Sequence, residues 1–124
     1  MYKVIFMLRY RKDLSPDYVR QEWLGSHGAI ALKLPRLRGY VQNHWTAPAT
    51  GHEQVYDGSV ELYFDDAADF EASFASPVGQ EMLKDDLRLF DRSGSPAYIG
   101  GVVDEHVMFW QPGPGENRAR EITQ

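Results

Sequence analysis

Trp23 and His27 are the pair of residues in this chain whose types and spacing are best suited to chemistry. They lie four residues apart, close to one helical turn, so both side chains emerge on one face of a helix. The same face carries an apolar stripe, made of Val19, Trp23, Ile30 and Leu34. Imidazole exchanges a proton near neutral pH more readily than other side chains. A histidine aimed at the interior beside an indole therefore either fills a core or lines a pocket.

The plainer alternative for His27 is a buried structural histidine whose ring N–H is satisfied by a backbone carbonyl. Gly25 and Gly28 flank it, and each costs about 1 kcal/mol relative to alanine inside a helix. These glycines allow either the close approach of a ligand or tight packing of helix on sheet. The sequence is compatible with both interpretations.

His44 and Glu61 are candidates on expected strands. His44 shares a strand face with Tyr40 and Gln42, a polar and aromatic row that suits contact with a ligand. A sheet face wetted at the edge of a dimer would explain the row nearly as well. Glu61 lies between two apolar residues. If its side chain faces inward, it needs a partner and its pKa would be raised. If it faces solvent, it has no special role.

Asp85 and Asp86 interrupt an otherwise amphipathic helix. Asp86 falls near the middle of the apolar arc and Asp85 at its edge. A carboxylate placed there orients a histidine or acts as a second acid–base group, although acidic residues in such helices more often form the solvated side. His52 and His106 are predicted to lie at the surface.

Composition and charge exclude several classes of function. The chain has 124 residues, 43% of them hydrophobic, a net charge of −5 and no cysteine. The acidic balance argues against nucleic acid, and the lack of cysteine excludes disulfides and thiolate metal sites. No apolar run reaches the ~18 residues of a membrane span, and no signal peptide precedes the first strand, so we expect a cytoplasmic protein without membrane contact. Without a metal-binding histidine motif or a glycine-rich phosphate loop, we expect no metal and no cofactor.

The elements that must position these residues follow from alternation, periodicity and caps. Ser-Pro pairs at Ser15 and Ser76 each predict a helix start. The predicted strands cover 2–10, 38–46, 58–65 and 97–110, and the predicted helices cover 15–34, 67–75 and 77–91. We expect one domain over 1–110 and a polar C-terminal tail over 111–124.

The βαβ–βαβ order of these elements predicts an α+β fold, the ferredoxin-like split βαβ plait. In this fold a four-stranded antiparallel sheet carries its helices on one face. The strands here are apolar on both faces, so a monomer would expose a large apolar patch. We therefore predict a homodimer in which two sheets face each other.

Several runs together resemble the EthD-domain family of the dimeric α+β barrel superfamily, over most of residues 2–110. Tyr63 stands where the family often has Trp, and Asp86 and Leu89 stand where Glu and Phe are common. The matching runs are Glu22-Trp23 with His27, Leu34 to His44, Tyr56-Asp57-Gly58 with Glu61 to Phe64, and Phe74 to Gln80 with Asp85 and Asp91.

The resemblance implies a dimeric α+β barrel and a small-molecule pocket between helices and sheet that contains the Trp-x-x-x-His unit. Relatives of this kind include a methylmuconolactone isomerase, polyketide dehydratases and a protein of ether degradation, and related barrels include cofactor-free monooxygenases. Membership in such a family determines the fold far better than the chemistry.

The leading hypothesis is a cofactor-independent lyase or isomerase acting on a small aromatic, lactone or polyketide-like molecule. His27 would shuttle the proton, and His44 would be a second proton or hydrogen-bond donor. Asp85 or Glu61 would hold an imidazole tautomer. The alternatives are a non-catalytic small-molecule-binding accessory protein and a cofactor-free monooxygenase. The expected site comprises catalytic His27, His44 and Asp85, with substrate-binding Trp23, Tyr40 and Glu61.

Overall fold

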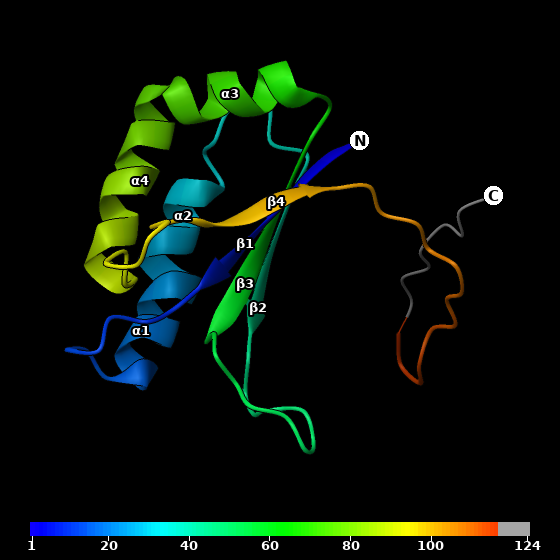
Figure 1. Ribbon diagram of the computed structural model, residues 1–124. Coiled ribbons are helices and arrows are strands. Elements are labelled where there is room, and N and C mark those ends of the chain that lie inside the picture. Colours follow the sequence, from blue (N-terminus) through cyan, green and yellow to red (C-terminus); the bar gives the residue numbers. More distant parts are fainter. Residues whose placement is uncertain (117–124) are drawn as a thin grey trace.

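A single antiparallel sheet of four strands, in the order β2-β3-β1-β4, organises the computed structural model, which describes residues 1–116 (Figure 1). Each strand pairs with its neighbours in antiparallel register, and β1 and β3 lie at the centre. The strands are β1 (Tyr2–Leu8), β2 (Gly39–His44), β3 (Gly58–Phe64) and β4 (Ile99–Val103). This is the predicted ferredoxin-like fold, which is confirmed.

All helices lie on one face of this sheet (Figure 1). Their starts agree with the predicted caps, because the hydroxyls of Ser15 and Ser76 accept hydrogen bonds from backbone N–H groups of the first turn. The carboxylate of Asp66 does the same for the short third helix. The helical segments are α1 (Pro16–Glu22), η1 (Trp23–His27), α2 (Gly28–Ala31), α3 (Ala67–Ala75) and α4 (Pro77–Leu89).

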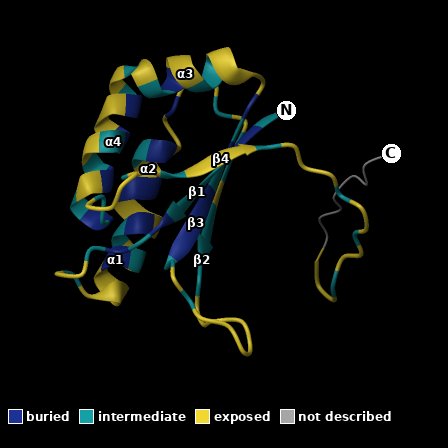
Figure 2. Cartoon of the chain, in the orientation of Figure 1, coloured by how far each residue is buried: buried dark blue, intermediate teal, exposed yellow. Residues whose placement is uncertain are grey.

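The core lies between the helices and the sheet, and the other sheet face is only partly covered (Figure 2). Because side chains alternate along a strand, Val4, Leu8, Val60 and Leu62 point to the core. Their neighbours form the face turned away from the helices, which we call the open face; its apolar members are Ile5, Met7, Val41, Tyr63, Ile99 and Val103.

The prediction of one continuous helix over 15–34 is wrong in its middle and at its end. Residues Trp23–His27 form a π-helical turn, in which the N–H of Gly28 donates to the carbonyl of Trp23, five residues back. That carbonyl also accepts a hydrogen bond from the Gln42 side chain at 2.8 Å. The second donor from the sheet and the weak helix propensity of glycine favour the wider turn.

The predicted last strand, 97–110, is also too long. Val103 pairs with Lys3 and ends the ladder, and β1 itself begins at Tyr2. Beyond Val103 the described chain therefore continues outside the sheet. Of the predicted tail, 117–124 lie outside the described residues. Within residues 1–116, no helix combines the length and apolar character that crossing a bilayer requires.

Gly58 is the position at which Trp23 rests directly on the sheet. A Cβ atom there would lie 2.8 Å from Cη2 of Trp23 and 2.7 Å from the carbonyl oxygen of Asn43. Both neighbours are fixed, one as a fully buried ring and one as strand backbone. The absence of a side chain therefore decides how deeply the indole enters the core.

We expect Gly58→Ala to lower the free energy of unfolding by about 1–3 kcal/mol, because the added methyl overpacks a filled site. Urea titration followed by circular dichroism measures this. The matched control is Gly101→Ala, another strand glycine, whose Cβ would meet nothing within 4 Å. Equal losses from the two substitutions would contradict the close approach of Trp23.

Candidate functional site

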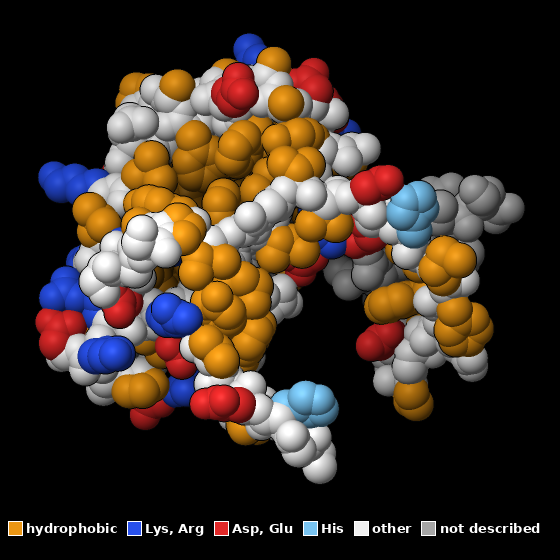
Figure 3. Space-filling model, in the orientation of Figure 1, with side chains coloured by type: hydrophobic (Ala, Val, Ile, Leu, Met, Phe, Trp, Pro, Cys, Tyr) orange, Lys and Arg blue, Asp and Glu red, His pale blue; other side chains and the backbone are white. Residues whose placement is uncertain are grey.

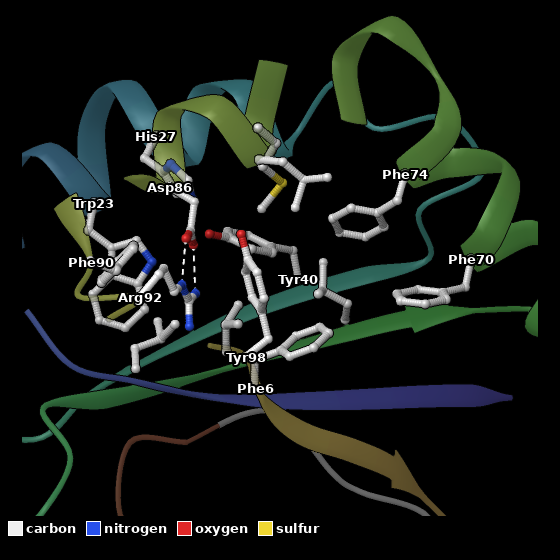
Figure 4. A pocket seen from close by; sticks show the side chains of 15 residues that line it. Phe6, Trp23, His27, Tyr40, Phe70, Phe74, Asp86, Phe90, Arg92 and Tyr98 are labelled. Carbon is white, nitrogen blue, oxygen red and sulfur yellow. Dashed lines mark hydrogen bonds and ion pairs between the residues drawn. The ribbon is translucent and has the colours of Figure 1, made fainter. Parts of the chain in front are cut away.

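A pocket of about 270 Å³ lies between the helices and the sheet. Aromatic and aliphatic side chains form most of its wall, and Phe70 and Phe74 stand at the end away from His27 (Figure 4). Apolar side chains also gather on the surface between α3, α4 and β4 (Figure 3). The polar side chains that line the pocket come from several elements: His27, Tyr40, Asp86, Arg92 and Tyr98.

His27 is buried, with 3% of its surface exposed, and its ring lines the pocket. Its Nδ1 lies 2.8 Å from Oδ2 of Asp85 on α4. A carboxylate only accepts hydrogen bonds, so Nδ1 donates to Asp85, and in the neutral form of the imidazole Nε2 carries the lone pair. No described residue forms a hydrogen bond with Nε2. The geometry therefore leaves one basic nitrogen at the wall of an apolar pocket.

Asp85 is itself held in place by Arg88, whose Nε donates to it at 2.9 Å. Burial alone would raise the pKa of Asp85, but hydrogen bonds from Arg88 and His27 outweigh burial and hold the pKa below its ordinary value. Arg88 also donates to Glu22 at 3.0 Å, which joins α4 to α1. The carboxylate that orients the imidazole is thus ionised and fixed from two helices.

Tyr40 belongs to a hydrogen-bonded row on β2. The amide of Gln42 donates to the Tyr40 hydroxyl at 2.8 Å, so the phenolic proton stays available to a ligand. Burial raises the pKa of Tyr40, which keeps the phenol protonated at neutral pH. The carbonyl of Gln42 accepts from Nε2 of His44 at 2.8 Å, and His44 stacks on Trp23 with ring centroids 4.0 Å apart. His44 therefore touches the pocket wall from behind rather than lining the pocket.

Asp86, Arg92 and Tyr98 are pocket residues absent from the site expected from sequence. Nε and Nη2 of Arg92 donate to the two carboxylate oxygens of Asp86 at 2.7 and 2.8 Å. The guanidinium also lies 4.3 Å from the ring centre of Tyr98. The position of Asp86 in the apolar arc of its helix was the one available signal. Arg92 follows the helix in an irregular segment, where no periodicity indicates orientation. Tyr98 falls within the strand predicted over 97–110, but the observed strand begins only at Ile99.

Glu61 is not brought together with the other predicted site residues. It lies on the open face, where it accepts from Lys3 at 2.7 Å and from Asn43 at 2.9 Å. Burial would raise the pKa of Glu61, but these partners outweigh burial and lower it. His52 and His106 are exposed, as predicted. Across residues 1–116, no three side chains of the metal-binding types come together.

These observations define a ferredoxin-like α+β protein with a largely apolar, aromatic pocket beneath a π-helical turn. The EthD domain matches residues 11–93, two thirds of the chain, and the chain belongs to this family. The resemblance inferred from sequence is confirmed. Comparison with curated proteins gives no significant match.

Solved structures show the same fold. An EthD family protein from Bacillus halodurans is 17% identical, with a TM-score of 0.67 over 85% of this chain and 98% of that one. A dimeric ferredoxin-like protein from Thermobifida fusca is 19% identical, with a TM-score of 0.63 over 82% and 88%. A hydroxynitrile lyase from Passiflora edulis is 19% identical, with a TM-score of 0.65 over 84% and 94%. At such identities the likeness establishes the fold alone.

We expect Asp85→Asn to destabilise the protein at pH 7 by about 1–3 kcal/mol, because the charge that strengthens the partly buried contacts of this side chain with His27 and Arg88 is lost. The pKa of Asp85 is lowered on folding, so its stabilisation is present above the unfolded value and is lost as the pH falls through the folded value. The difference between wild type and variant should therefore shrink below about pH 4. Urea denaturation from pH 2.5 to 7 measures it.

Asp65→Asn provides the control, because its side chain is 61% exposed and lies 3.6 Å from Arg38. We expect that change to cost under about 0.5 kcal/mol at every pH. A difference for Asp85→Asn that stays constant down to pH 2.5 would contradict an ionised, paired Asp85.

Proposed function

We propose that the protein is a cofactor-independent lyase or isomerase that moves a proton on a small aromatic, lactone or polyketide-like molecule. One observation carries the proposal: His27 is buried, its Nδ1 is bound by Asp85, and its Nε2 has no hydrogen-bond partner among the described residues and lies at the wall of an apolar pocket. Such an imidazole is oriented for general acid–base catalysis, which typically contributes 10²–10⁴-fold in rate. The Passiflora relative, a hydroxynitrile lyase, is an example of lyase chemistry on this fold.

The size and lining of the pocket support an aromatic or similarly compact apolar substrate. A cavity of about 150 Å³ accommodates benzene. The pocket here encloses about 270 Å³, which suits a molecule of roughly two rings. Trp23, Phe90 and Phe74 would pack against its faces, and a bound apolar substrate would displace water and strengthen each polar contact.

In this proposal each polar residue has a defined role. His27 removes a proton from carbon and returns it, while Asp85 keeps the required tautomer and stabilises the imidazolium. The Tyr40 hydroxyl donates to the oxygen on which negative charge develops. His44, expected from sequence to be a second donor, would act through Gln42 by orienting that hydroxyl.

The dimer predicted from sequence is part of the same proposal. The open face has half-buried apolar residues, including Ile5 and Met7, and the Thermobifida fusca relative is described as dimeric. Two open faces packed together would remove this surface from water without covering the pocket, which lies on the helix side. The dimer would thus leave the proposed chemistry accessible in each protomer.

Hydrogen–deuterium exchange tests the catalytic proposal whatever the product of the reaction is. In D₂O, the protein should catalyse exchange of the acidic C–H hydrogen of small lactones and aryl ketones for deuterium. The loss of the C–H signal in ¹H NMR spectra measures the rate. We expect His27→Ala to lower the catalysed rate by 10²–10⁴-fold while leaving the circular dichroism spectrum unchanged. His52→Ala, which removes an exposed histidine, should retain the wild-type rate.

Exchange that survives His27→Ala would contradict the assigned base. Compounds that bind with the same affinity to wild type and His27→Ala, without exchange or turnover, would instead favour the non-catalytic binding protein. Oxygen uptake with an electron-rich phenol would favour the cofactor-free monooxygenase.

A further inference from the structure

The segment after β4 leaves the body of the protein with apolar side chains exposed. We call residues 104–110 the arm; it lies on the side of the sheet away from the helices (Figure 1). Met108 and Phe109 are 79% and 78% exposed. In the space-filling view the arm stands across an open space from the body (Figure 3). Adjacent large apolar side chains held in water indicate a surface that another molecule covers.

The start of the arm is fixed rather than free to swing. Glu105 accepts a hydrogen bond from Nζ of Lys3, and Glu61 accepts a second one at 2.7 Å. Lys3 is only 7% exposed, on the open face of the central strand β1. Burial alone would lower the pKa of Lys3, but the two carboxylates outweigh burial and raise it, so the lysine is charged. This ion pair directs the arm away from its own helices.

The sequence prediction extended the last strand through Trp110, and the end of the arm is rich in strand-forming apolar residues, Val107 to Trp110. The arm nevertheless lies outside the sheet of its own chain, because the ladder ends at Val103, which pairs with Lys3 near the start of β1. An extended segment at the edge of a sheet readily pairs with a second chain. The arm and the open face lie on the same side of the sheet, away from the helices (Figure 1).

We propose that each arm crosses to a second copy of this chain and covers part of its open face, with Met108 and Phe109 buried between protomers. The occupant is a second copy because the chain carries both complementary parts, an apolar face and an apolar arm, as a two-fold interface requires. This inference rests on the dimer proposed above and goes beyond it, since two sheets can face each other without exchanging arms.

Paired substitutions test the contribution of the arm to the dimer. We expect Phe109→Glu to weaken the dimer at least tenfold in Kd, measured by sedimentation equilibrium, because a charge would enter the interface. Leu32→Glu is the matched control: Leu32 is 71% exposed, a fraction similar to that of Phe109, but it follows the helix α2 on the opposite side of the sheet. Its Kd should stay within twofold of wild type.

The absence of cysteine allows a direct test of where the arm lies. Phe109→Cys and Leu32→Cys are each labelled with benzophenone maleimide, mixed with unlabelled ¹⁵N protein and irradiated. We expect the probe at position 109 to form ¹⁴N–¹⁵N cross-links that map by mass spectrometry to residues of the open face. The probe at position 32 should form none there.

The outcomes separate the arm from the other proposals. A dimer that keeps its wild-type Kd after Phe109→Glu, or cross-links confined to one chain, would overturn arm exchange while leaving the dimer intact. A wild-type protein that is monomeric at all concentrations would overturn both. The hydrogen–deuterium exchange that depends on His27 is measured separately, and its result does not depend on the arm.

Discussion

The hydrogen bond between His27 and Asp85 is the interaction on which the site depends. An imidazole buried beside aromatic rings loses its hydration, and one fixed acceptor offsets part of that cost. Asp85 is in turn held by Arg88, and Arg88 reaches Glu22 on the first helix. The chain of contacts fixes α4 against α1 and leaves the pocket-facing nitrogen unused. Nδ1 of His27 thus contributes to the stability of the fold, and Nε2 is left available for reaction.

The π-helical turn links this histidine to the sheet. Its wider winding gives the Trp23 carbonyl two donors, the N–H of Gly28 and the side chain of Gln42. Gln42 also contacts Tyr40 and His44, so one amide joins the helix to two further residues of the site. Such turns are often found at functional sites. Here the irregular turn places an indole and an imidazole in the wall of the same pocket.

The fold was predictable because its signals are local: alternating strands and Ser-Pro helix starts. The site was predictable only where periodicity applies. It indicated that Asp86 faces inward, but its partner Arg92 lies beyond the helix, where nothing in the sequence specifies direction. Glu61 is a residue whose direction the strand pattern does determine. Its neighbours Val60 and Leu62 point to the core, so alternation alone places Glu61 on the opposite face.

Side chains alternate between the two faces of the central strands, so the residues that line the pocket and those of the open face come from the same strands. Phe6 and Val60 point toward the pocket, whereas Lys3 and Glu61 point away from it. A register slip of one residue would reverse every side chain. It would press the charged lysine into the apolar core without a carboxylate, at a cost of several kcal/mol. The ion pair on the open face therefore specifies the one register in which aromatic residues build the pocket.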